Sequence, residues 1–188
     1  MGFLSKFFGN KGGTNNSAPD ALMGDEQFWA LISTSWEESE GEYERQQEAL
    51  ENNLSTLTEQ EIILFDNKFR DLRGKAYTWD LWAAIYIIHG GCGDDSFHDF
   101  REWVIAQGRL FYNRTVAEPA SLIDFDPELF EADWEGMGYV AGNAFKKVTG
   151  QEMISGFKEN EDITGEEWGE EGDDLKLKYP LLWDKYAA

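Results

Sequence analysis

The sequence is poor in cysteine, in long apolar runs and in basic residues, and each shortage excludes a class of protein. A single cysteine, Cys92, cannot form a disulfide within the chain, which is typical of proteins from a reducing compartment. The longest apolar run, residues 81–88, is about half the length that a bilayer span needs. We therefore predict a cytoplasmic protein without a transmembrane segment.

Basic residues are few: 16 Lys and Arg stand against 37 Asp and Glu, which gives a formal net charge of −21. A surface of that sign repels nucleic-acid phosphates, and the sequence holds no local basic patch, so we expect no direct nucleic-acid binding. Aromatic residues make up 15% of the chain, which argues against disorder, and 188 residues can form one domain with a sizeable core.

The composition changes near residue 25. Residues 10–20 are rich in Gly, Asn and Ser without periodicity, so we interpret residues 1–24 as a flexible tail and residues 25–188 as the folded domain. The stretch 1–9 is too short and too weakly charged for a secretory signal. Weak peripheral membrane contact through residues 1–9 stays open beside the simpler reading of a loose leader. The sequence does not fix the oligomeric state.

Apolar residues recur at helical spacing through most of the domain, whereas strand signals are almost absent. The predicted helical segments are 25–36, 42–54, 58–74, 78–89, 94–108, 109–116 and 131–148. Thr58 and Glu61 match a capping box, Asp25 and the residues 94–96 are candidate N-caps, and Gly74 is a candidate stop. We predict an all-α fold: a single compact multi-helix domain with a buried central helix, 78–89.

The charge is unevenly distributed along the chain. Residues 25–57 hold nine acidic residues and one basic residue, and residues 151–188 hold eleven acidic and four basic residues. The segments between them are closer to balance. Residues 151–174 are acidic and Gly-rich, so we expect an irregular C-terminal segment, closed by the apolar anchor 175–183.

Several blocks of sequence together resemble a known family. These are FWALI at 28–32, AYTWDLW at 76–82, GGCGDDSFHDFREW at 90–103 and YPLLW at 179–183. Over residues 25–186 the chain is similar to the bacterial domain-of-unknown-function family 4240, and the Gly-Gly-Cys block is its most specific part. The resemblance implies an intracellular helical domain, sometimes joined to a WGR domain in proteins labelled molybdate-metabolism regulators. No WGR pattern is present here, and the family transfers no catalytic residues.

The loop and helix start from residue 89 to residue 101 concentrate unusual chemistry. The candidate ligand-binding residues are His89, Cys92, Asp94, Asp95, His98 and Arg101. Imidazole and carboxylate groups suit zinc or iron, but their spacing matches no standard ligand pattern, so we assign no metal and no cofactor. Asp residues as helix caps and a buried Arg101–Asp pair are the structural alternative.

Two weaker patterns suggest a catalytic or a metal-binding role. Cys92 lies near a helix N-terminus, which lowers a thiol pKa and favours a nucleophile, although a lone cysteine is often a small buried apolar residue. Residues 160–171 match a calcium loop in part, with Asn160 where Asp is usual. No catalytic constellation is complete, so a non-enzymatic role is favoured.

Three functions remain as hypotheses. The first is an acidic protein-binding module that recognises a basic protein surface as an adaptor, a regulator or an immunity-type inhibitor. Its candidate contact residues are Glu44, Glu48, Glu51, Glu166, Glu167, Trp168 and Glu170. The alternative is an enzyme or a small-ligand or metal-binding protein that uses residues 89–101. The third is a nucleic-acid mimic, which requires one continuous acidic stripe.

Overall fold

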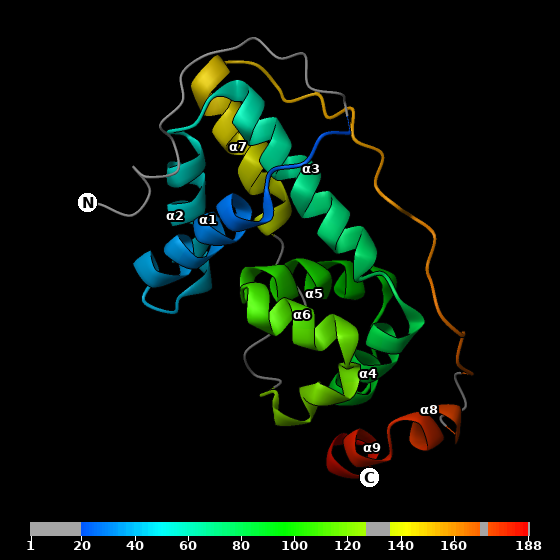
Figure 1. Cartoon of the computed structure of the whole chain (residues 1–188). Coiled ribbons are helices and arrows are strands. Elements are labelled where there is room, and N and C mark those ends of the chain that lie inside the picture. The colour runs from blue at the N-terminus through cyan, green and yellow to red at the C-terminus, as the bar shows by residue number, and fades with distance from the viewer. Residues whose placement is uncertain (1–19, 127–135, 170–172, 188) are drawn as a thin grey trace. The chain divides into compact units, whose positions relative to one another are not determined.

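The computed structural model describes residues 20–126, 136–169 and 173–187, and Figure 1 labels its helices. The described residues contain helices and no strand beyond one isolated bridge, so the all-α prediction is confirmed. The chain divides into two compact units: residues 1–70 with 138–158, and residues 71–137 with 159–188. No helix among the described residues is long and apolar enough to cross a membrane. Residues 1–9, for which the sequence left both weak membrane contact and a loose leader open, lie outside the described residues.

The first unit contains α1 (Asp25–Glu38), α2 (Tyr43–Leu54), the first part of α3 (Glu59–Lys75) and most of α7 (Met137–Thr149). Its core is aromatic: the rings of Phe28 and Phe65 stack with centroids 4.8 Å apart, and both side chains are buried. The capping box at the start of α3 is confirmed, because the Thr58 N–H donates to Glu61 Oε2 at 2.9 Å and the Glu61 N–H donates to Thr58 Oγ1 at 3.3 Å.

The second unit contains the end of α3, then α4 (Trp79–His89), α5 (Asp94–Ala106), α6 (Arg109–Ala117) and the 3-10 helix η2 (Pro119–Asp124). Thr78 caps α4 by accepting from the Leu81 N–H at 3.1 Å, and Gly90 closes the helix with the positive φ of 64° that glycine tolerates. Leu81, Ile85 and the other inward residues of α4 are buried, as predicted for the central helix.

Some predicted helix ends are wrong by one residue, and some residues predicted as N-caps lie in the first turn. Glycines 24 and 93 are the N-caps of α1 and α5, so Asp25, Asp94 and Asp95 lie in the first turn instead. Helix α3 continues through Gly74 to Lys75. The part of the last predicted helix before residue 136 lies outside the described residues.

The C-terminal region follows the prediction in part. Residues 151–169 form no helix, whereas the apolar anchor folds as two short helices, α8 (Asp173–Lys178) and α9 (Pro180–Tyr186). Leu175 and Leu182 are buried, and the Lys185 Nζ donates to the Ile123 carbonyl at 2.6 Å. The two helices therefore pack against the rest of the second unit.

Candidate functional site

The predicted ligand-binding residues lie along the end of α4, the following loop and α5. Asp94 and Asp95 are exposed, while Arg101 is buried. Cys92 is half-buried in the loop, and its carbonyl accepts from the Trp82 Nε1–H at 2.9 Å. Among the described residues, no group of three or more His, Cys, Asp or Glu side chains could hold a metal ion.

The thiol of Cys92 has the opposite character to an activated nucleophile. Burial raises its pKa to about 12, so the thiol stays protonated at neutral pH. The lowered pKa that we expected from the nearby helix N-terminus is therefore wrong. Desolvation by the surrounding chain outweighs the effect of the helix end.

The two histidines have different surroundings. Burial lowers the pKa of His89, which favours the neutral imidazole. The His98 side chain is 43% exposed, with Nδ1 3.4 Å from Asp99 Oδ1 and 3.9 Å from Glu102 Oε1. His98 therefore lies beside the carboxylates of α5, and this group of polar side chains extends into the interior.

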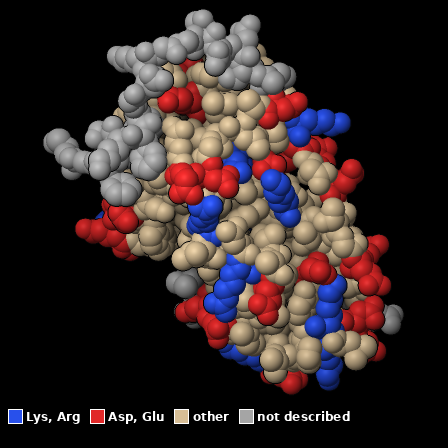
Figure 2. Space-filling view, in the orientation of Figure 1, with Lys and Arg blue, Asp and Glu red and all other residues tan. Residues whose placement is uncertain are grey.

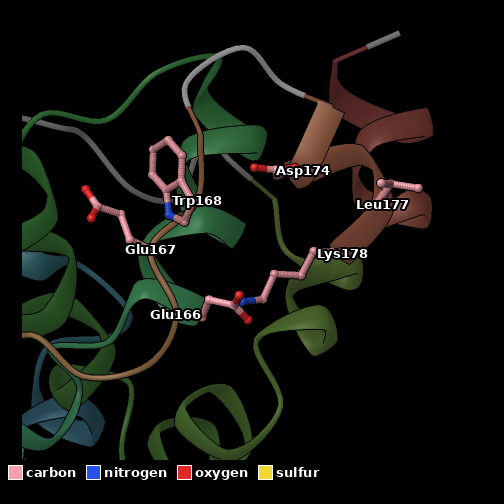
Figure 3. Close-up of a pocket in the computed structure, with 6 residues that line it drawn as sticks. All are labelled: Glu166, Glu167, Trp168, Asp174, Leu177 and Lys178. Atoms are coloured by element: carbon pink, nitrogen blue, oxygen red, sulfur yellow. The ribbon is translucent and has the colours of Figure 1, made fainter.

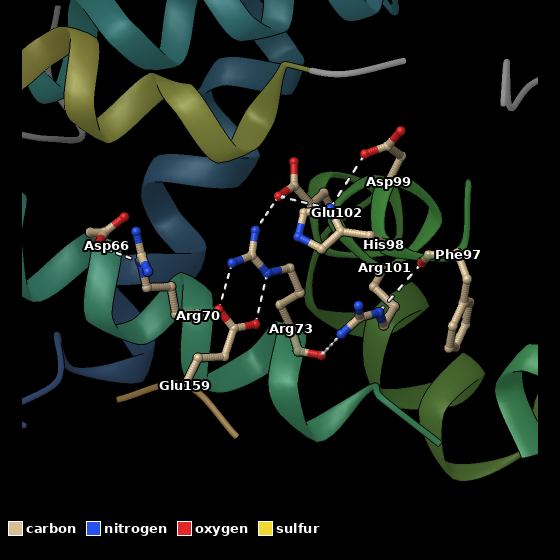
Figure 4. Close-up of polar contacts among 9 residues, drawn as sticks. All are labelled: Asp66, Arg70, Arg73, Phe97, His98, Asp99, Arg101, Glu102 and Glu159. Carbon is tan, nitrogen blue, oxygen red and sulfur yellow. Dashed lines mark hydrogen bonds and ion pairs between the residues drawn. The ribbon is translucent and has the colours of Figure 1, made fainter. Parts of the chain in front are cut away.

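The centre of this group is Arg73, which the sequence did not single out. Its guanidinium donates to Glu102 through Nη1 and to both oxygens of Glu159, at 2.8 Å from Nε and 2.5 Å from Nη2 (Figure 4). Burial opposes the charge, yet the hydrogen bond of Glu159 and the negative charges of Glu102 and Glu159 raise the pKa of Arg73 overall. Arg73 thus joins α3, α5 and the C-terminal segment within the second unit.

Among the described residues, Arg101 does not form the predicted pair with an aspartate. In the described part of the chain its Nε donates to the Phe97 carbonyl at 3.4 Å and its Nη1 donates to the Arg73 carbonyl at 3.2 Å. Its guanidinium carbon lies 4.3 Å from the centroid of the Tyr77 ring, a cation–π geometry. Burial, and then the charge of Arg73, lower the pKa of Arg101. These contacts connect α5 with the end of α3, so Arg101 has a structural role.

Figure 4 also draws the pair of Asp66 and Arg70, which belongs to the first unit. Arg70 Nε donates to Asp66 Oδ2 at 2.8 Å, one turn along α3. This is an i, i+4 pair of the kind that supports a helix.

Residues 159–168 contact the rest of the second unit at several points. Beyond the Glu159–Arg73 contact, Thr164 forms a parallel bridge with Thr78, and its carbonyl accepts from the Trp79 N–H at 2.9 Å. In the stretch that partly matches a calcium loop, Asn160 Oδ1 accepts from the Asp162 N–H at 3.2 Å. The last position of that stretch, residue 171, lies outside the described residues.

Trp168 folds back onto α4 instead of projecting into solvent. Its ring centroid lies 5.9 Å from that of Trp79, 6.4 Å from that of Trp82 and 4.8 Å from that of Tyr86. Within the described residues, no hydrogen-bond acceptor is in reach of its indole N–H. The tryptophan anchors the end of the segment through aromatic packing.

A pocket opens beside Trp168 (Figure 3). Its volume is about 410 Å³, and the described residues that line it are Glu166, Glu167, Trp168, Asp174, Leu177 and Lys178. The first three come from the irregular segment and the last three come from α8, so the pocket lies within the second unit. The acidic and aromatic side of this pocket was predicted from the sequence, whereas α8 was not.

The predicted partner-contact residues are mostly accessible. Glu44, Glu48, Glu166 and Glu167 are exposed, and none of them forms an ion pair with another described residue. Glu51 is half-buried and lies 3.5 Å from Lys147. Glu170 lies outside the described residues. In the view of Figure 2, acidic side chains are spread over the described surface with basic side chains between them.

Comparison with known proteins places the chain in one family. The sequence model of the family DUF4240, described as a protein of unknown function, matches residues 23–147. The chain belongs to the DUF4240 family. No curated protein and no solved structure matches it. The match includes α4 with Trp79 and Trp82, whereas the pocket residues 166–178 lie beyond the matched range of the DUF4240 family.

Proposed function

We propose that the chain is an acidic protein-binding module that acts in the cytoplasm as an adaptor, a regulator or an immunity-type inhibitor of a basic partner. The observation that supports this proposal is the set of exposed carboxylates without cationic partners among the described residues: Glu44, Glu48, Glu166 and Glu167. A carboxylate that no internal cation neutralises keeps its full charge for a partner.

The physical advantage of such a surface lies in the association step. Complementary charge steers a basic partner to the acidic surface and raises the association rate, and it rejects partners of the same sign. The net charge of −21 provides a long-range attraction for a basic protein, which salt weakens. We therefore expect the binding to depend on ionic strength.

The two acidic regions differ in what surrounds them. Glu44 and Glu48 lie on α2, a helix whose only cation, Arg45, is 3.4 Å from Glu40. Glu166 and Glu167 precede Trp168 at the edge of a pocket. Interfaces gain most of their binding energy from aromatic and apolar groups inside a polar rim, so we assign the principal contact to the second region.

The experiment uses two double variants with the same net charge, Glu44→Gln/Glu48→Gln and Glu166→Gln/Glu167→Gln. The wild type and both variants are used to capture proteins from the host lysate at low and at physiological ionic strength. The captured protein is identified and purified, and its Kd is measured with each form. We expect a basic protein that binds the Glu166→Gln/Glu167→Gln variant more weakly than the charge-matched variant.

Two results would contradict the proposal. One is the recovery of no partner at either ionic strength. The other is a captured protein with the same Kd for the wild type and both double variants, since its binding would then not use these carboxylates.

A further inference from the structure

The pocket beside Trp168 has walls that the packing of the second unit holds in place. On one side, Trp168 is fixed by its contacts with Trp79, Trp82 and Tyr86 of α4. On the other side, Leu175 of α8 is buried. The Gly169 N–H donates to Asp174 Oδ2 at 3.1 Å and thereby connects the two sides. The walls are therefore present before any ligand binds, which lowers the entropy cost of binding.

The charge of the pocket is negative. Among the described lining residues, Glu166, Glu167 and Asp174 carry carboxylates and Lys178 carries an ammonium group; in Figure 3 the Glu167 carboxylate points away from α8. Lys178 already forms an ion pair with Asp80 Oδ1, so its charge is shared with a further carboxylate. In Figure 3 the side chains of Glu166 and Lys178 point toward one another, although these two described residues form no ion pair. An excess of negative charge remains around the opening.

The aromatic wall adds a second element of recognition. An indole ring attracts a cation placed over its face, by about 0.5–1 kcal/mol at exposed sites. The same ring surface also accepts the aliphatic stem of a long cationic side chain. Trp168 thus complements both the charged end and the methylene groups of such a side chain.

The chemistry of the lining separates the classes of ligand. An anion would meet several carboxylates, and an apolar ligand would leave them desolvated without compensation. A metal ion needs convergent ligands, and no suitable group exists among the described residues. An organic cation with an aliphatic stem satisfies the carboxylates and the indole ring together.

We propose that the pocket lined by Glu166, Trp168, Asp174 and Lys178 binds a lysine or arginine side chain presented by the basic partner. This inference rests on the proposed function, and it names the site and the group that is recognised. Leu177 and Leu181 of the neighbouring short helices are 82% and 72% exposed, and they provide apolar contact area beside the pocket. A segment that carries a cation next to an aliphatic residue fits this combination.

The test uses a defined probe and the full chain. Acetyl-trilysine amide is titrated into the ¹⁵N-labelled protein, and the same peptide with acetylated lysine side chains is the neutral control. The indole N–H signal of Trp168 is identified by its loss in Trp168→Phe. We expect saturable shifts of this signal and of the Leu177 resonances with the charged peptide and none with the neutral peptide.

The charge-matched variants locate the binding. Loss of an exposed ion pair weakens binding by roughly 2- to 5-fold for each carboxylate removed, so Glu166→Gln/Glu167→Gln raises the Kd of the peptide accordingly. Glu44→Gln/Glu48→Gln carries the same net charge, and we expect it to leave the Trp168 shift and its Kd unchanged.

Each other result has a separate meaning. If the charged peptide shifts only residues of α2, the pocket assignment is wrong while binding of basic partners stands. If no signal shifts in any part of the protein, both proposals fail. If the neutral peptide produces the same shifts at Trp168, the pocket recognises apolar groups and the cation proposal is overturned.

Discussion

The interior around Arg73 and the exposed face of α2 use the same chemical groups in opposite ways. Arg73, Glu102 and Glu159 have side chains that are 11%, 4% and 15% exposed, and the single guanidinium forms ion pairs with both carboxylates. Glu44 and Glu48 are exposed and form no ion pair with another described residue. Removing one member of a buried ion pair leaves an uncompensated charge, whereas exposed charges contribute little to stability. Burial therefore makes the first set structural and leaves the second set available to a partner.

The substitution with the largest expected effect is Arg73→Ala. It removes the guanidinium that bonds Glu102 and both oxygens of Glu159 in a region of low solvent access, and breaking a buried pair in this way costs about 3–5 kcal/mol. Urea unfolding of the wild type and the variant measures the free energy of unfolding. The attachment of residues 159–168 weakens with it, so we also expect faster proteolysis in this segment.

A matched control is Arg114→Ala. Arg114 lies 3.4 Å from Asp124, and its side chain is 59% exposed, so its removal costs less than about 1 kcal/mol. If Arg73→Ala and Arg114→Ala destabilise the protein equally, burial does not distinguish the two kinds of charge in this chain.

The reaction rate of the Cys92 thiol tests whether burial also controls the chemistry of the loop after α4, which the sequence predicted to be part of a ligand-binding site. The folded-state pKa of about 12, against an ordinary value of 9.0, reduces the thiolate population at mildly alkaline pH. After allowance for the greater nucleophilicity of the more basic thiolate, we expect reaction with an aromatic disulfide to be roughly 50-fold slower in the folded chain than in the unfolded chain. Because the folded-state pKa is raised, the corresponding stability is present below pH 9.0 and is lost as the pH rises toward about 12.

Absorbance at mildly alkaline pH follows this reaction directly, because Cys92 is the only thiol of the chain. The chain in denaturant is the reference. Equal rates in the folded and unfolded chain would restore the interpretation of Cys92 as an accessible nucleophile.

The parts of the fold that the sequence predicted are those with local causes. Thr58 and Glu61 form their capping box three residues apart, and Thr78 and Gly90 bound α4 through a side-chain cap and a positive φ. Helices α8 and α9 escaped prediction because six and seven residues are too few for a clear apolar period. Aspartate favours both the N-cap and the first turn, which is why Asp25 was placed one position wrongly.

The candidate sites depend on contacts between distant residues, and these have no local signature. Arg73 and Glu159 are 86 positions apart, and no spacing in the sequence relates them. The acidic and aromatic character of residues 166–168 was visible, but the packing of Trp168 on Tyr86 and the position of α8 depend on the tertiary fold. The acidic residues could therefore be located from the sequence, while the structure shows which of their carboxylates already form ion pairs within the described residues.

The smallest expected effect completes the comparison from the exposed side. Glu44 and Glu48 lie four residues apart on α2, and like charges at this spacing destabilise a helix by about 0.2–0.5 kcal/mol. At low ionic strength the relief of this repulsion opposes the loss of Glu44 from the first turn of α2, where a negative charge favours the helix, so Glu44→Gln/Glu48→Gln should change the free energy of unfolding by less than about 1 kcal/mol. The change should shrink at physiological ionic strength, where the Debye length is about 8 Å. Urea unfolding at both ionic strengths measures this difference. A loss of more than about 1 kcal/mol would instead mean that these carboxylates stabilise the fold, because exposed charges without partners contribute less than that. They would then belong with Glu102 and Glu159, and the acidity of α2 would no longer support a binding role.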